Sequence, residues 1–249
     1  LRPRRRRVEA GGNNGAGRRR RHGRAGRRDD HHRKGSLTGV VSLDGRPLLV
    51  PPSAPPYQGY QLHAGVFTPR QCRRIVDLAH GMRLDDALLG GVAGAEIPDE
   101  GIRRSRTAWI PPTDESWWIY DKLAKVVAKA NRTYRFDLTG FAEDLQFTAY
   151  DEPGAFYGWH QDGLDGAVAV RKLSIVVQLT SPDEYEGGEL QFFEVLDDDD
   201  DERFEEFTVL SRELGTAIVF PSFEYHRVMP IRSGARHSLV SWVSGPPFR

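Results

Sequence analysis

The second half of the chain contains a series of short strand-like runs, and this pattern constrains the fold more than any other feature of the sequence. Turn signals such as Pro153-Gly154 and Ser233-Gly234 fall between the runs. The predicted strands cover 145–150, 172–180, 188–195, 206–210, 215–221, 225–230 and 236–243. Several short strands at this spacing are typical of a sandwich or barrel, of which the jelly roll is one closed form.

Helices are predicted only before this region. Thr68 is expected to cap a helix that has Pro69 at its first position. Its apolar stripe consists of Cys72, Ile75, Val76 and Ala79. A second helix is predicted over 114–131, with a buried side formed by Trp118, Leu123, Val126, Val127 and Ala130. We further expect a strand to end at Val66-Phe67, a Gly-rich loop at 83–105, and an extended segment at Trp109-Ile110. The predicted fold class is mostly β with flanking α-helices.

Charge divides the chain into two parts, although the formal net charge of the whole is zero. Residues 1–34 carry 14 basic and three acidic residues, so the remainder has 21 basic and 32 acidic residues. We predict that residues 1–36 are a disordered Arg/Gly-rich tail and that 37–56 are a Pro-rich linker. The tail would suit a nucleic-acid partner, but no aromatic residues interleave with its arginines. The folded domain is expected at 57–249.

Several classes of protein are disfavoured by what the sequence lacks. The single cysteine, Cys72, excludes an internal disulfide framework and a cysteine-based zinc cage, and fits a cytoplasmic location. No apolar run approaches the roughly 20 residues that span a bilayer, so we expect no membrane partner. The acidic run 197–206 lacks the spaced ligands and glycine of a calcium loop. It is predicted to be a solvated loop between two strands.

Two distant segments together predict a metal site. His160 and Asp162 are two residues apart, a spacing that puts both side chains on one face of an extended segment. His226 follows 64 residues after Asp162. Two imidazoles and one carboxylate can occupy one face of an octahedral metal ion, as in the facial triad of non-haem Fe(II) oxygenases.

Arg236 lies on the last predicted strand, where alternation places it on one face with Ser238, Val240 and Trp242. A buried guanidinium requires an anion, and a carboxylate accepts two parallel hydrogen bonds from it. Arg236 and Ser238 therefore predict an anchor for a dicarboxylate behind the metal. His237 points to the opposite face and is expected at the surface. The Gly187-Gly188 pair is expected to form a hairpin turn.

At these residues the sequence resembles the Fe(II)/2-oxoglutarate-dependent dioxygenases, and most of all the prolyl 4-hydroxylase alpha-subunit and PKHD-type hydroxylase branch. The resemblance covers roughly 145–243. Its markers are the blocks Phe156-Tyr157-x-Trp159-His160-x-Asp162, Ser181-Pro182-Asp183-Glu184-Tyr185-x-Gly187-Gly188-Glu189-Leu190 and His226-Arg227-Val228-x-Pro230, with Tyr150, Phe220-Pro221 and Gly234-Ala235-Arg236. The tail and the acidic run lie outside it.

The resemblance implies a double-stranded β-helix (jelly roll, cupin-like) that hydroxylates a C–H bond and releases succinate and CO2. It implies that His160, Asp162 and His226 bind Fe(II), and that Arg236 and Ser238 hold 2-oxoglutarate. Tyr150 matches a tyrosine that hydrogen-bonds the cosubstrate in some relatives, and Gln178 falls near a position that lines the same pocket. Ascorbate is implied as a reductant, O2 as a co-reactant, and a prolyl or other amino-acid side chain of a protein, peptide or small molecule as the substrate.

Two other functions are consistent with the same sequence. A cupin-like binding module would keep the fold without turnover, although an intact triad and Arg236 disfavour it. A nucleic-acid-associated protein would act through the Arg-rich arm, residues 1–36, and would bind with a steep dependence on salt. Succinate production separates the first alternative from a hydroxylase.

Overall fold

The computed structural model describes residues 58–87, 101–164, 166–198, 201–208 and 211–247. The predicted tail (1–36) and linker (37–56) lie outside the described residues. The described residues contain two α-helices, α1 (Pro69–His80) and α2 (Trp117–Tyr134), with short 3-10 turns at Gly166–Val168 and Pro182–Glu184. The strands are β1 (Gln61–His63), β2 (Asp85–Asp86), β3 (Arg103–Arg104), β4 (Arg106–Ile110), β5 (Gly140–Phe141), β6 (Leu145–Tyr150), β7 (Phe156–His160), β8 (Arg171–Gln178), β9 (Tyr185–Gly187), β10 (Leu190–Asp198), β11 (Asp201–Thr208), β12 (Ala217–Pro221), β13 (His226–Val228), β14 (Ile231–Gly234) and β15 (Arg236–Ser244).

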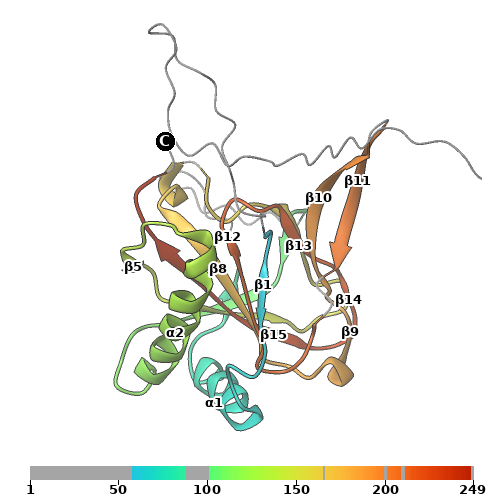
Figure 1. The fold of residues 1–249 in the computed structure, drawn as a ribbon. Helices are drawn as coiled ribbons and strands as arrows, with labels where there is room; N and C mark the ends of the chain where they lie inside the picture. The colour runs from blue at the N-terminus through green and yellow to red at the C-terminus, as the bar shows by residue number, and fades with distance from the viewer. Residues whose placement is uncertain (1–57, 88–100, 165, 199–200, 209–210, 248–249) are drawn as a thin grey trace, which may run out of the picture. The chain divides into compact units, whose positions relative to one another are not determined.

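These strands form antiparallel sheets, two of which face each other. The larger, eight-stranded sheet has the order β1-β12-β8-β15-β6-β4-β2, with β5 added against β15. The smaller, five-stranded sheet has the order β11-β10-β13-β7-β3, and β14 pairs with β9 in a separate ribbon. Figure 1 shows α1 and α2 together on one side of the body, and β10 and β11 on the other. The predicted mostly β fold with flanking helices is confirmed.

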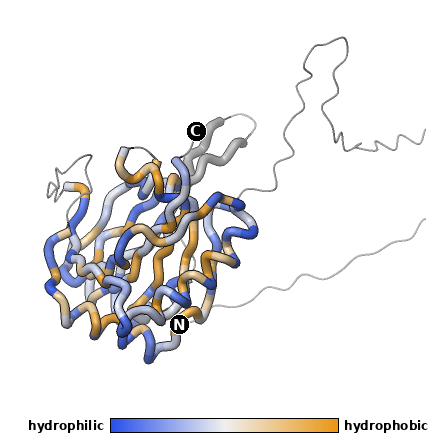
Figure 2. The backbone as a smooth tube through the Cα atoms, turned by 90° about the vertical axis from the view of Figure 1, so that its left-hand side faces the viewer, coloured by the Kyte–Doolittle hydropathy of each residue, from blue (hydrophilic) through white to orange (hydrophobic). Residues whose placement is uncertain are grey.

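The two helices cover one face of the large sheet because each has an apolar stripe that faces it. Thr68 caps α1 through a reciprocal bond with Gln71, and Pro69 occupies the first turn, as predicted. Cys72, Ile75 and Ala79 of α1 are buried. They join a core with residues of α2 and with the helix-facing side chains of the sheet: Leu145, Phe147, Ala149, Leu173, Ile175, Val177, Leu239 and Val243. In Figure 2 the hydrophobic stretches run through the middle of the body.

The opposite face of the large sheet points toward the small sheet, since side chains alternate along a strand. A second core joins the sheets there, formed by Tyr150, Val176, Ile218 and Phe220 from one side and Leu190, Phe192 and Val228 from the other. The same inner face also carries polar side chains, Gln146, Thr148, Ser174, Gln178, Arg236 and Ser238, all of which are buried. The space between the sheets is therefore polar along one wall.

Several local predictions differ from the structure. The strand before α1 ends at His63, so Val66-Phe67 lies in a turn, where the Phe67 N–H donates to Gly215 O. The predicted loop 83–105 contains the short strands β2 and β3. The acidic run is not a simple loop, because β10 and β11 pair through it as far as Asp198 and Asp201. Strand pairing there outweighs the unfavourable propensity of the acidic residues.

The Gly187-Gly188 pair does not form a hairpin turn, because β9 pairs with β14 and not with β10. Both glycines have a positive φ, of 80° and 64°. A Cβ atom on Gly187 would lie 2.2 Å from the Pro230 carbonyl oxygen, and one on Gly188 would lie 3.0 Å from Cδ of Arg236. The pair therefore allows the chain to pass closely over β14 and over the side chain of Arg236.

His237 is half-buried, so its predicted surface position is wrong. It does point away from Arg236, but the opposite face of β15 is the one that α1 covers. Its ring lies 5.5 Å from the ring of His80 and 5.3 Å from that of Phe147. Burial, with further effects from His80 and Arg236, lowers the pKa of His237 to about 4.

Within the described residues, neither α1 nor α2 is both long and apolar enough to cross a lipid bilayer.

The buried His237 ring predicts a loss of stability in acid. Since the unfolded chain takes up a proton near pH 6.5 and the folded chain only near pH 4, the neutral ring stabilises the fold fully above pH 6.5. That contribution is lost as the pH falls from 6.5 toward 4. We expect His237→Gln to flatten the dependence of the free energy of unfolding on pH in this window, by on the order of 1–3 kcal/mol at pH 4. Urea titrations at several pH values measure the effect, and parallel curves for the two proteins would contradict it.

Candidate metal centre

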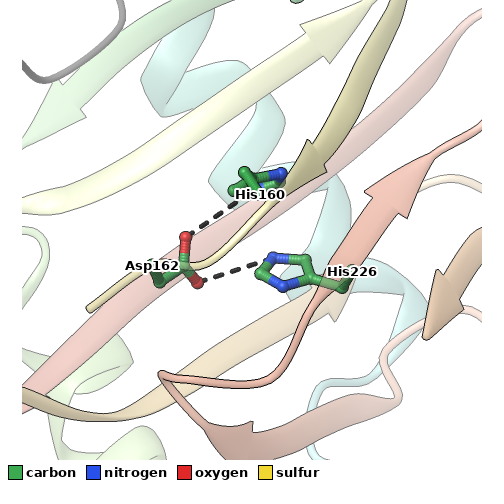
Figure 3. A group of neighbouring side chains, drawn as sticks. All are labelled: His160, Asp162 and His226. Carbon is green, nitrogen blue, oxygen red and sulfur yellow. Dashed lines mark ion pairs between the residues drawn. The ribbon is translucent and has the colours of Figure 1, made fainter. Parts of the chain in front are cut away.

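Antiparallel pairing of β7 with β13 brings His160 and His226 together. The two residues are direct cross-strand partners, and their ring centroids are 4.1 Å apart. Residues directly opposite each other on one face of an antiparallel pair are close enough for their side chains to meet. Figure 3 shows both imidazoles directed toward Asp162. One strand pairing thus brings into contact two histidines that are far apart in the sequence.

Asp162 lies just beyond the end of β7, where backbone hydrogen bonds hold the chain. The N–H groups of Asp162 and Gly163 both donate to the carbonyl oxygen of Ser222, at 2.9 Å. The two Asp162 carboxylate oxygens lie 3.6 Å from Nε2 of His160 and 3.6 Å from Nε2 of His226 (Figure 3). One ligand atom from each of the three residues lies within 4.8 Å of the other two.

Each histidine is oriented by a hydrogen bond to the backbone. His160 Nδ1 lies 2.8 Å from Gly158 O, and His226 Nδ1 lies 2.9 Å from Glu224 O. A carbonyl oxygen only accepts, so Nδ1–H is the donor in both rings. In the neutral ring Nε2 is therefore unprotonated and free to act as a ligand, the arrangement by which proteins orient metal-binding histidines.

The protonation states of His226 and Asp162 also suit metal binding. Burial and the neighbouring His160 lower the pKa of His226 to about 4, so this imidazole is neutral at neutral pH. Burial alone would raise the pKa of Asp162, but His226 and His160 outweigh it and hold that pKa well below its usual range. A neutral imidazole and an ionised carboxylate are the forms that bind a metal.

The spacing of the three groups fits one small divalent cation. Two ligand atoms at right angles, each about 2.1 Å from one ion, are about 3 Å apart. The 3.6 Å distances are slightly longer, and they exceed the length of an ordinary hydrogen bond. Oδ2 of Asp162 is buried and has no hydrogen-bond partner among the described residues. An unpartnered buried carboxylate oxygen needs a cation, so the donor set and its geometry fit an Fe(II) ion.

The three residues line a cavity of about 460 Å³ between the two sheets. Alternate residues of β15 form one of its walls, Arg236, Ser238, Val240 and Trp242, as the alternation predicted. Arg236 is 1% exposed and lies at the closed end, whereas Trp109, which also lines the cavity, is 45% exposed. None of the three guanidinium nitrogens of Arg236 has a hydrogen-bond partner among the described residues. This unpaired buried cation leaves room for an anion.

Of the other residues predicted to bind the cosubstrate, two line the cavity and one does not. Tyr150 and Ser238 line the cavity, and Tyr150 is the cross-strand partner of Arg236, whose guanidinium lies 5.4 Å from the Tyr150 ring centroid. Gln178 is the cross-strand partner of Ser238 and is buried. It is not among the residues that line the cavity. The structure therefore brings Tyr150, Ser238 and Arg236 together and leaves Gln178 beside them.

Three further side chains at the cavity had no role in the sequence prediction. The ring of Tyr157 stacks on that of His160 with centroids 3.5 Å apart, and Arg103 lies over the Tyr157 ring. Arg171 pairs with Glu143 and donates to the carbonyl oxygen of Asp162. Tyr157 belongs to the quoted motif that contains His160, so the sequence held a signal for it. Arg103 and Arg171 reach the cavity only through tertiary pairing.

Comparison with known proteins agrees with this site. A family model described as the 2OG-Fe(II) oxygenase superfamily matches residues 145–244. A PKHD-type hydroxylase of Gloeothece citriformis is 40% identical over 101 residues, which cover 40% of this chain and 41% of that protein. Another PKHD-type hydroxylase, from Rippkaea orientalis, is 30% identical over 141 residues, covering 55% of this chain and 59% of that protein. The chain thus spans about half the length of these curated relatives.

Solved structures share the fold. A Pseudomonas putida prolyl-4-hydroxylase superposes with a TM-score of 0.58 at 23% identity, covering 76% of this chain and 93% of that one. A Trichoplax adhaerens prolyl hydroxylase, solved with a hypoxia inducible factor peptide fragment, gives a TM-score of 0.59 at 15% identity, covering 75% and 83%. These matches confirm the jelly-roll fold.

The matched residues 145–244 contain the three residues of the triad and Arg236. In sequence this region is similar to PKHD-type hydroxylases, and the chain shares its fold with a prolyl-4-hydroxylase.

The triad predicts that Asp162 is required for metal binding. We expect Asp162→Ala to weaken binding of Mn(II), used as a redox-stable probe, by on the order of 100-fold or more, because loss of even an indirect partner costs about 10- to 100-fold. Isothermal titration calorimetry measures the affinity. Asp183→Ala, which removes an exposed carboxylate outside the cavity, is the matched control and should bind as the unmodified protein does. Equal Mn(II) affinity in Asp162→Ala would place the metal elsewhere.

Proposed function

We propose that this domain is an Fe(II)- and 2-oxoglutarate-dependent hydroxylase that acts on a C–H bond of a prolyl or other amino-acid side chain. One observation carries the proposal. A metal-ligand triad and a buried, unpaired guanidinium line the same cavity. A cation site and an anion site within one cavity are what a metal-chelating keto-diacid requires.

His160, Asp162 and His226 would hold the iron, and the cosubstrate would take further positions on it. When bound, Fe(II) with 2-oxoglutarate and O2 supplies the oxidising chemistry and converts the cosubstrate to succinate and CO2. The protein contributes geometry. The backbone bonds to Nδ1 of both histidines hold each Nε2 toward the ion, and the Tyr157 ring fixes the plane of His160 by stacking.

Arg236 would anchor the distal carboxylate of 2-oxoglutarate through two parallel hydrogen bonds, with the hydroxyl of Ser238 on the same wall as a further donor. Tyr150 covers the guanidinium from the adjacent strand. Its hydroxyl is a second candidate donor to the cosubstrate. Gln178 would act on this anchor only through Ser238, its cross-strand partner.

Apolar side chains from both sheets line part of the cavity beside these polar groups. Val176 and Val240 line it from the large sheet, and Leu190 and Val228 from the small one. Exclusion of water strengthens the attraction between Arg236 and a carboxylate, and it protects reactive species from side reactions. The closed end is therefore suited to the cosubstrate and the open end, near Trp109, to the substrate.

The named relatives support an amino-acid side chain as the substrate. The solved structures include prolyl hydroxylases, one of them with a bound peptide fragment. From the sequence we expect three segments to determine substrate choice, 83–105, 163–171 and 197–206. The first two contribute Arg83, Arg103 and Arg171 to the cavity. Ascorbate would serve as a reductant that keeps the iron ferrous.

The two alternative functions, a cupin-like binding module and a nucleic-acid-associated protein, differ from a hydroxylase in the residues that they require. A binding module needs neither the triad nor an unpaired guanidinium, and it would form no succinate. A nucleic-acid role rests on residues 1–36, which lie outside the described residues.

The anchor assignment predicts a specific kinetic defect. We expect Arg236→Ala to raise the apparent KM for 2-oxoglutarate roughly 10- to 150-fold, which corresponds to loss of a charge-assisted hydrogen-bonded pair worth about 1.5–3 kcal/mol. Mn(II) affinity should change little, because the metal ligands remain. Arg232→Ala removes an exposed guanidinium of β14 and serves as the control. An unchanged KM in Arg236→Ala would move the anchor elsewhere.

The proposed function is tested by a substrate screen that couples 2-oxoglutarate decarboxylation to a mass gain of one oxygen atom. Prolyl-containing peptides, other peptides and free amino acids form the panel. We expect stoichiometric succinate and hydroxylated product from at least one prolyl or other amino-acid substrate, and no succinate from Asp162→Ala. Iron-dependent turnover in that variant, or the absence of succinate with iron bound and every substrate present, would overturn the proposal.

A further inference from the structure

A second hollow adjoins the mouth of the cavity. It is an open groove of about 450 Å³ between the first turns of α2 and the segment that contains β5. Trp117, Tyr120 and Phe141 supply its aromatic surface, and Asp121, Glu143 and Asp144 its charged groups. Glu143 lines both the groove and the cavity. A chain lying in the groove therefore reaches the mouth of the cavity without leaving the surface.

The aromatic side chains form a rigid array. The Trp117 and Tyr120 rings meet edge to face with centroids 5.6 Å apart, and Tyr120 and Phe141 do so at 5.7 Å. Tyr120 is buried, with its hydroxyl donating to Ile110 O. Trp117 is 56% exposed, an unusual position for a large aromatic side chain that fills no core. Trp117 is therefore the exposed member of an aromatic array that lines the groove, and aromatic-lined grooves are typical binding sites for extended, proline-rich peptides.

The charge of the groove is of one sign. Its lining contains three carboxylates and no lysine or arginine. Arg171 pairs with Glu143, but no described cation forms an ion pair with Asp121 or Asp144. Two acidic side chains beside an exposed indole complement a guanidinium or ammonium group, which gains both ionic attraction and contact with the ring face.

We propose that the groove formed by Trp117, Tyr120, Phe141, Asp121 and Asp144 docks the substrate polypeptide through a basic residue next to the residue that is hydroxylated. This inference rests on the proposed function and adds the substrate class: an extended, proline-containing segment with an arginine or lysine at a fixed distance from the target. The groove holds the basic residue, and the chain passes Glu143 into the cavity.

Binding of defined probes tests the inference without turnover. The probes are fluorescein-labelled nine-residue peptides of proline and alanine, with one arginine placed at each position in turn, and the same set with glutamate. Affinity is measured by fluorescence anisotropy on the full chain, with and without Fe(II) and 2-oxoglutarate, in the absence of oxygen. At one or more positions we expect the arginine peptide to bind at least tenfold more tightly than its glutamate counterpart, with a preference that weakens as salt increases.

Matched variants assign the preference to the groove. Asp121→Asn combined with Asp144→Asn should abolish it, whereas Asp77→Asn, which neutralises an exposed acid of α1, should keep it. Trp117→Ala should lower the affinity for the arginine peptide at least fivefold, and Trp117→Phe should lower it less than Trp117→Ala does. Equal binding of arginine and glutamate peptides, or a preference that survives in the double variant, would overturn the inference. So would a dimer that Trp117→Ala converts to a monomer, because a second copy would then cover the groove.

The peptide experiments distinguish failure of the docking inference from failure of the hydroxylase proposal. If the arginine peptides bind as expected but no peptide yields succinate once oxygen is admitted, the docking inference stands and the hydroxylase proposal fails. If arginine and glutamate peptides bind equally and are hydroxylated with equal kcat/KM, the hydroxylase proposal stands and the docking inference fails.

Discussion

Antiparallel pairing of β7 with β13 is the contact on which the candidate metal centre depends. It places His160 opposite His226, and the turn that follows β7 is held by Ser222 so that Asp162 completes the set. Loss of this pairing would separate the two imidazoles and so dismantle the triad. The site is therefore a property of the small sheet as a unit and not of one loop.

The large sheet has two chemically different faces, and each face has its own role. One face is apolar and packs against α1 and α2, whereas the other carries buried polar groups that face the small sheet. Burying Arg236 without a partner costs free energy, and the helix-side core provides the stabilisation that offsets this cost. Gly188 keeps the chain close over the same arginine. Stability and function are thus divided between opposite faces of the same strands.

Under the proposed function, the cavity and the groove have separate parts in the selection of a substrate. The closed end is lined by strand-borne groups such as Arg236 and Ser238, whereas other parts of the cavity lining come from the segments before β4 and β8, and α2 and β5 line the neighbouring groove. Strand-borne groups are held rigidly, as chemistry at a metal requires, while connecting segments tolerate change and carry specificity. A basic, extended substrate would then be recognised outside the metal site and oxidised within it.

Local sequence was sufficient for several of the strands, the capped helix α1, the inward face of β15 and the three residues of the candidate metal centre, because each depends on alternation, capping or ligand chemistry within a few residues. Tertiary structure alone decided the rest. His237 is half-buried because α1 packs on its face of β15. The Gly187-Gly188 pair lies in close contact with β14 and does not form a hairpin turn. The acidic run is part of the strand pair β10 and β11. Arg103, Arg171 and Trp117 gained their places for the same reason. Which side chains meet across sheets and helices depends on pairings between residues far apart in the chain, and no local pattern encodes those pairings.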